Sequence, residues 1–111
     1  MMADVTALPA AAAILEKLPK TAVDAAYFQV PTVKDKLTVE APHGIDVQWL
    51  INDNRNKNVL LEGLENLSWR DGNPAIFVAG EANQTKAIKT QIKRKPGYMR
   101  KQAYFSGYWK A

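Results

Sequence analysis

The spacing of apolar and polar residues changes close to residue 19. Residues 9–18 are rich in alanine and leucine, and Ile14, Leu15 and Leu18 recur at a spacing of three and four, which is the pattern of one helix face. A proline at the first helical position and Pro19 after the last bound this segment. We therefore expect a short helix over residues 9–18, which either caps the domain or forms an arm that grips a neighbouring subunit.

Beyond residue 20 the period falls toward two, which is typical of β-strands. Alternation is most regular in Ile45–Ile51, and Ala75–Ala79 is an unbroken apolar run of the kind that is covered on both faces. Residues 52–58 are polar and predict a loop. The strands that the pattern predicts are residues 23–30, 32–40, 45–51, 59–62, 64–69, 75–79, 85–93 and 98–109, with residues 59–62 forming a hairpin with residues 45–51. A helical turn is the alternative for residues 64–69, and helix propensity also permits a helix over residues 85–93.

Many short strands without an internal repeat predict a mainly-β single domain, a sandwich, jelly roll or small barrel with a short N-terminal helix or arm. We expect residues 1–20 to form the arm and residues 21–111 to form a β domain that ends in a basic, aromatic-rich strand pair. The expected core consists of Val39, Ile45, Val47, Trp49, Ile51, Leu61, Trp69, Ile76, Val78, Ile88, Ile92, Phe105 and Trp109.

Composition narrows the function classes. A chain of 111 residues forms one domain, and the absence of cysteine together with a single histidine excludes disulfides and histidine- or thiolate-based metal centres. No apolar run approaches the ~20 residues that span a bilayer, and no signal peptide is evident. We expect no membrane partner and no secretion through a signal peptide.

The net charge of +4 is divided unevenly. Residues 1–81 hold all 11 acidic residues and 7 of the 15 basic ones, a balance of −4, whereas residues 82–111 hold 8 basic residues and no acidic one. The same last segment holds half of the aromatic residues, which argues against a disordered tail. It therefore predicts a surface for a partner or for the acidic part of the chain itself.

No catalytic constellation stands out. His43 lies in a predicted turn, and the candidates for a nucleophile or an acid–base pair are scattered along the chain: Ser68, Ser106, Asp46, Glu62, Glu65 and Asp71. We expect no catalytic residue, no metal, no cofactor and no small-molecule substrate.

The candidate binding residues are the bases and tyrosines of the last strand pair. They combine positive charge with rings that can pack against a partner. These residues are Lys89, Lys93, Arg94, Lys95, Tyr98, Arg100, Lys101, Tyr104 and Tyr108. A protein partner is the first hypothesis; the alternative is single-stranded nucleic acid, with tyrosines stacking on bases and lysines on phosphates.

In size, strand-rich make-up, alanine-rich arm and lack of an active site, the chain resembles the decoration (cement or staple) proteins of tailed-phage capsids, although it shares no sequence motif with them. The resemblance implies a non-enzymatic structural protein on the capsid surface of a virion, with shell proteins as partners. The arm would make its contacts through Leu8, Ile14 and Leu15. The nucleic-acid alternative implies a cytoplasmic protein instead.

Overall fold

The computed structural model describes residues 1–36, 39–52, 58–67, 69 and 75–110. Helices and strands alternate along the chain. In order they are β1 (Met2–Asp4), α1 (Leu8–Lys17), β2 (Val23–Val30), a 3-10 helix (Val33–Asp35), β3 (Gly44–Ile51), α2 (Val59–Glu65), β4 (Ile76–Glu81), α3 (Ala82–Ile92), a second 3-10 helix (Arg100–Gln102) and β5 (Ala103–Trp109).

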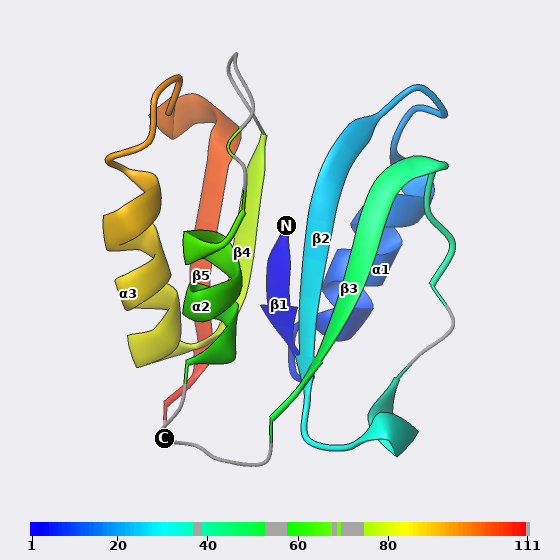
Figure 1. Cartoon of the computed structure of the whole chain (residues 1–111), viewed down its shortest axis with the longest axis horizontal. Coiled ribbons are helices and arrows are strands. Elements are labelled where there is room, and N and C mark those ends of the chain that lie inside the picture. Colours follow the sequence, from blue (N-terminus) through cyan, green and yellow to red (C-terminus); the bar gives the residue numbers. More distant parts are fainter. Residues whose placement is uncertain (37–38, 53–57, 68, 70–74, 111) are drawn as a thin grey trace.

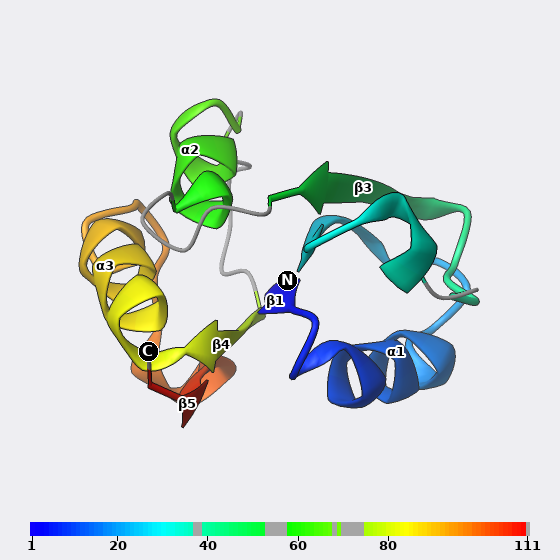
Figure 2. The same ribbon diagram turned by 90° about the horizontal axis from the view of Figure 1, so that it is seen from below.

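The five strands form one sheet in the order β3-β2-β1-β4-β5, and every neighbouring pair is parallel (Figure 1). Helix α1 covers one face, while α2 and α3 cover the other (Figure 2). Parallel strands need crossover connections, which here include helices. The fold is therefore a three-layer α/β fold, and the prediction of a mainly-β sandwich, jelly roll or barrel is wrong.

Two apolar clusters hold these layers together. Between α1 and the sheet, Leu8 and Leu15 pack with Phe28, and all three are at most 1% exposed. On the opposite face, Leu64 of α2 and Ile88 of α3 belong to the second cluster. Strand β4 contributes to both clusters, which confirms that its apolar run is covered on both faces.

Three of the predicted strands lie in or around helices. Residues 59–62 and the start of 64–69 belong to α2, so the predicted hairpin with residues 45–51 does not form. Gly63 lies within α2 and does not break it, and a β-carbon at this position would lie at ordinary contact distance from the side chains of Tyr27 and Leu50. Residues 85–92 belong to α3. The helical spacing of its buried face had been obscured by β-branched residues two positions apart.

Two further predicted strands are replaced in part. Val33–Asp35 is a 3-10 helix, in which the backbone N–H and the hydroxyl of Thr32 donate to Asp35 Oδ2. Of residues 98–109, only Ala103–Trp109 is a strand. Residues 37–38, most of the predicted polar loop (53–57), Ser68 and Asp71 lie outside the described residues.

The helix at residues 9–18 and the strands at 23–30, 45–51 and 75–79 are confirmed within two residues by α1, β2, β3 and β4. The division of the chain at residue 20 stays a prediction. Among the described residues, no helix is both long enough and apolar enough to cross a bilayer.

Candidate functional site

The order of the strands reverses beside β1. From β1 the chain passes through α1 to β2 on one side, whereas β4, on the other side of β1, is followed by α3 and β5. The loops after β1 and β4 therefore leave the sheet in opposite directions. In open α/β sheets this arrangement opens a crevice at the carboxyl ends of the strands, where ligands bind.

Asp4, the last residue of β1, organises this edge. Its side chain is buried, at 3% exposure, and it accepts hydrogen bonds from three directions. Oδ1 accepts from the backbone N–H and the hydroxyl of Thr6, while Oδ2 accepts from the backbone N–H of Glu81 at 2.9 Å and from Trp109 Nε1 at 2.9 Å. One carboxylate thus joins the ends of β1, β4 and β5. We call Asp4, Thr6, Glu81 and Trp109 the carboxyl-edge cluster.

Two glycines allow close packing at the carboxyl ends of β4 and β5, Gly80 against the Asp4 carboxylate and Gly107 against the start of α3. Gly80 has a φ of 157°, and a β-carbon there would lie 2.7 Å from Asp4 Cγ and Oδ2. A β-carbon on Gly107 would lie 2.9 Å from Ala82 Cα. Larger residues at either position would push apart the elements that the carboxyl-edge cluster joins.

The two helices that start at the carboxyl ends of β1 and β4 differ in whether an acidic side chain caps their N-terminus. The carboxylate of Glu81 accepts from the backbone N–H groups of Asn83 and Gln84, so α3 already has an anion at its N-terminus. Ala7 gives α1 no side-chain cap. Of the three α-helices described, α1 alone therefore offers uncapped N–H groups, which attract anionic groups of a ligand.

Aromatic side chains occur along β5, from Tyr104 near the amino end of the strand to Trp109 at its carboxyl end. Trp109 is 37% exposed, while Tyr104 stacks on Phe77 with ring centroids 5.2 Å apart. Partial desolvation, and then a hydrogen bond with Tyr104, raise the pKa of Tyr108. The exposed ring of Trp109 at the carboxyl end of β5 can therefore bind a planar ring at the surface.

The predicted binding residues do not form a strand pair. Helix α3 starts at the carboxyl ends of the strands and ends near their amino ends. The structure therefore spreads the predicted binding residues between the two ends of the strands. Lys89 and Lys93 belong to α3 or its cap, Arg94, Lys95 and Tyr98 to the following turn, Arg100 and Lys101 to the second 3-10 helix, and Tyr104 and Tyr108 to β5.

Several of these side chains contact the domain itself. Lys89 Nζ lies 5.5 Å from the centre of the Phe105 ring, and Lys95 Nζ lies 5.7 Å from that of Trp69. The predicted arm residues Leu8 and Leu15 are buried against the sheet, and Ile14 is half-buried. His43 is exposed, and no group of three metal-ligating side chains occurs among the residues that the structure describes.

Sequence reasoning missed the carboxyl-edge cluster. The first eight residues carry no periodic signal, because β1 has only three residues, and Trp109 was assigned to the core. One signal was available: Gly80 and Glu81 end a buried parallel strand, where ligand-binding residues of α/β folds gather.

Known proteins resemble this chain along its whole length. The ferric vibriobactin reductase ViuB of Vibrio cholerae is 32% identical over 113 residues, which cover 99% of this chain and 42% of that protein. An uncharacterized protein of Mycobacterium tuberculosis is 29% identical over 96% of this chain and 42% of its own length. The chain therefore spans less than half the length of these relatives.

Solved structures of siderophore-related proteins also resemble this chain along nearly its whole length. A siderophore utilization protein from T. fusca is 31% identical with a TM-score of 0.87, over 98% of this chain and 43% of that one. The siderophore-interacting protein SipS from Aeromonas hydrophila is 24% identical with a TM-score of 0.90, over 100% of this chain and 50% of that one. The second likeness concerns the fold alone.

These likenesses overturn the functional predictions. The resemblance to phage decoration proteins is wrong, and with it fall the capsid-binding role, the shell-protein partners and the location in a virion. The nucleic-acid alternative has no support either, because the basic strand pair on which it rested is a helix, a turn and an edge strand.

The family assignment rests on the complete chain rather than on a short motif. The family model described as "Siderophore-interacting protein" matches residues 1–111. The protein therefore belongs to the siderophore-interacting protein family.

Proposed function

We propose that this chain is the reductant-binding domain of a ferric-siderophore reductase. The observation that carries the proposal is the carboxyl-edge cluster, which lies where the strand order reverses. The chain that carries this cluster is 32% identical to part of a ferric vibriobactin reductase. The proposal departs from the expectation, drawn from the sequence alone, that the protein is no enzyme.

Reduction of a ferric complex needs an electron donor. Doubly wound parallel sheets bind nicotinamide dinucleotides outside the carboxyl ends of their strands. A dinucleotide fits this edge, because the uncapped N-terminus of α1 suits a pyrophosphate and the exposed ring of Trp109 suits a planar base. The loop from Val5 to Leu8 contains no glycine, so the phosphates would be held by the helix N-terminus and Thr6 rather than by a glycine-rich turn.

The buried Asp4 would act as a positioning residue. It fixes the indole of Trp109 through Nε1 and the loop before α1 through Thr6, so both sides of the crevice depend on one carboxylate. Glu81 holds α3 in place by capping it, and both oxygens of its carboxylate accept hydrogen bonds from backbone N–H groups. The residues of this edge would thereby bind and orient the donor.

The test is a titration of the 15N-labelled chain with NADH and NADPH, followed by two-dimensional NMR. We expect a dinucleotide to shift the indole N–H of Trp109 and the backbone amides of Thr6 and Gly80 in a saturable manner. The indole of Trp69, which donates to Pro96 O at the far end of α3, should not move.

Two matched variants complete the test. We expect Trp109→Phe to weaken dinucleotide binding about tenfold, and Trp69→Phe to leave it unchanged within about twofold. If neither dinucleotide perturbs the carboxyl edge, or if both tryptophan variants weaken binding equally, the proposed site is wrong.

A further inference from the structure

Two exposed apolar side chains lie at the carboxyl ends of β2 and β3. Ile51, the last residue of β3, is 46% exposed, and Val33, in the 3-10 helix that follows β2, is 65% exposed. The two strand ends are neighbours, because Val30 pairs with Ile51 and its backbone oxygen accepts from the N–H of Asn52 at 2.9 Å. Exposed apolar surface therefore lies on the β2 side of β1, away from β4 and Trp109.

The 3-10 helix Val33–Asp35 lies on the same side of the sheet as α1 (Figure 2). The segment after it also packs there, since Val39 and Ala41 contact the apolar cluster between α1 and the sheet. Ile51 belongs to this face as well, because residues two positions apart in a strand share a face and Trp49 packs against the same cluster. The 3-10 helix, the end of β3 and the N-terminus of α1 therefore border one part of the crevice.

Asp35 holds a carboxylate in a fixed position at this place. Its Oδ2 accepts from the backbone N–H of Thr32 at 3.1 Å and from the Thr32 hydroxyl at 2.9 Å. The side chain is half-buried, and its Oδ1 accepts no hydrogen bond from the described residues. One oxygen is thus anchored, while the other can accept a hydrogen bond from a ligand.

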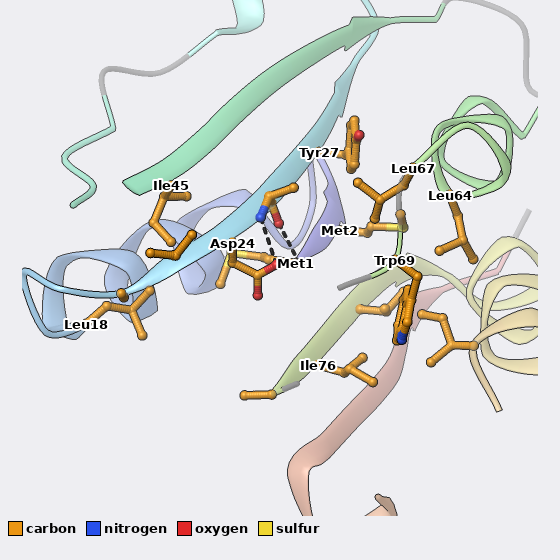
Figure 3. A pocket seen from close by; sticks show the side chains of 16 residues that line it. Met1, Met2, Leu18, Asp24, Tyr27, Ile45, Leu64, Leu67, Trp69 and Ile76 are labelled. Atoms are coloured by element: carbon orange, nitrogen blue, oxygen red, sulfur yellow. Dashed lines mark hydrogen bonds between the residues drawn. The ribbon is translucent and has the colours of Figure 1, made fainter. Parts of the chain in front are cut away.

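Sequence spacing alone would select a different carboxylate. In dinucleotide-binding sheets an acidic residue about twenty positions beyond the first turn binds the ribose 2′-hydroxyl, and Asp24 lies twenty positions after Asp4. Asp24, however, is the second residue of β2, and it lines a pocket at the amino ends of the strands together with Leu18 and Ile45 (Figure 3). Asp35 is the acidic residue that follows β2 at its carboxyl end.

We propose that the adenosine half of the dinucleotide binds between the N-terminus of α1 and the 3-10 helix, where its ribose 2′-hydroxyl donates to Asp35 Oδ1, and that the domain therefore binds NADH in preference to NADPH. This inference rests on the proposed function and specifies its donor. The adenine ring packs on Val33 and Ile51, which leaves Trp109 to the nicotinamide ring. NADPH carries a phosphate at the 2′ position, which would bring like charges together at Asp35.

Lys34 and Lys36 flank this carboxylate, but they are less able to select the ligand. Both side chains are exposed, so their ammonium groups stay in water, where an ion pair contributes little. The Asp35 carboxylate is held by Thr32 and partly desolvated, which strengthens its repulsion of a phosphate. The chain also contains no arginine before residue 55, and arginine is the side chain that accommodates a 2′-phosphate in such sheets. The local charges therefore favour a hydroxyl at this position.

The experiment measures the Kd of NADH and of NADPH for the full chain by isothermal titration calorimetry. We expect NADH to bind at least tenfold more tightly than NADPH, and Asp35→Asn to reduce this ratio to within about threefold. Asparagine keeps an oxygen that accepts from Thr32, so the turn is retained. Asp46→Asn is the matched control and should leave the ratio unchanged, since that exposed carboxylate lies in the amino half of β3 and accepts from Gln48 Nε2.

Fragments of the dinucleotide test the placement by NMR of the 15N-labelled chain. We expect 5′-AMP to shift the backbone amides of Val33 and Ile51, and nicotinamide mononucleotide to shift the indole N–H of Trp109 instead. If 5′-AMP shifts Trp109 and leaves Val33 and Ile51 in place, the adenosine half does not bind beside the 3-10 helix.

A double variant, Lys34→Ala with Lys36→Ala, separates the lysines from Asp35. We expect it to weaken both dinucleotides by similar factors. A selective loss of NADPH binding in this variant, or an NADH preference that survives Asp35→Asn, would overturn the inference. Equal Kd values of the parent chain for NADH and NADPH would do the same and leave the proposed function intact. If neither dinucleotide binds, the proposed function fails, and this inference fails with it.

Discussion

Gly80 and Gly63 differ in what a β-carbon would meet. At Gly80 it would approach the Asp4 carboxylate to 2.7 Å with a φ of 157°, whereas at Gly63, within α2, it would lie 3.6 Å from Tyr27 Cδ1. We expect Gly80→Ala to lower the free energy of unfolding by about 2–3 kcal/mol through this clash and the strained backbone. Gly63→Ala should raise the free energy of unfolding by about 0.5–1 kcal/mol, since alanine favours the helix.

Urea denaturation of the two variants beside the parent chain measures both effects. The opposite signs provide the control, because a general sensitivity of glycine positions would lower stability in both variants. A stable Gly80→Ala protein would show that the Asp4 carboxylate is not held against β4, and the carboxyl-edge cluster would then lose its structural basis.

Sequence alone could identify few of the site residues, for a reason that Asp4 illustrates. Its importance comes from a hydrogen bond to Trp109, 105 positions away along the chain, and from one to the backbone of Glu81. Neither contact leaves a local pattern. The bases of α3, in contrast, were conspicuous by composition, although the fold distributes them along a helix that runs between both edges.

At the scale of elements, α3 depends on the cap that Glu81 supplies. The two carboxylate oxygens of Glu81 accept hydrogen bonds from the backbone N–H groups of Asn83 and Gln84, each at 2.9 Å. We expect Glu81→Ala to lower the free energy of unfolding by about 1–2 kcal/mol, and Glu81→Gln to cost less, because an amide oxygen keeps one acceptor but loses the charge that favours a helix N-terminus.

Glu65→Ala is the matched control, since that exposed carboxylate ends α2 and faces the negative end of the helix. Thermal unfolding followed by circular dichroism should give a Tm equal to or slightly above that of the parent. If Glu65→Ala and Glu81→Ala lower Tm equally, the contribution of Glu81 is not a capping contribution.

Elements with a strong local signal were predicted correctly, and those with two competing signals were not. Strand β2 was predicted to the residue, and the apolar run of β4 even indicated a strand covered on both faces, as in a parallel sheet. In α3, the buried residues Thr85, Ile88 and Ile92 have helical spacing, but Ile88, Thr90 and Ile92 also alternate. Packing against β4 and β5 decides between the two, and this information is absent from a local window.

At the scale of the whole molecule, the uneven charge along the sequence becomes uneven charge in space. The basic segment, residues 82–111, forms α3 and β5 at one end of the sheet, while α1, β2 and β3 form the other end (Figure 1). The sequence therefore predicted a polarised molecule, but not which elements carry the charge. Strand order could not be predicted, because β1 and β4 pair across more than seventy positions.

A polarised charge should guide an anionic ligand to the α3–β5 end. NADPH, an anionic dinucleotide of the kind proposed above as the ligand of this domain, is a suitable probe. We expect the double variant Lys86→Glu and Lys93→Glu, both exposed on α3 or its cap, to weaken its binding about threefold to tenfold at low ionic strength. The double variant Lys17→Glu and Lys20→Glu makes the same charge change at the α1 end and should have a much smaller effect.

Equilibrium titration at two salt concentrations separates this effect from damage to the fold. In 1 M salt the screening length is about 3 Å, so the difference between the two double variants should disappear if it arises from the field of the basic end. A difference that persists in 1 M salt would instead indicate direct contact between α3 and the dinucleotide. Equal losses from both double variants would mean that total charge, rather than its distribution over the fold, governs binding.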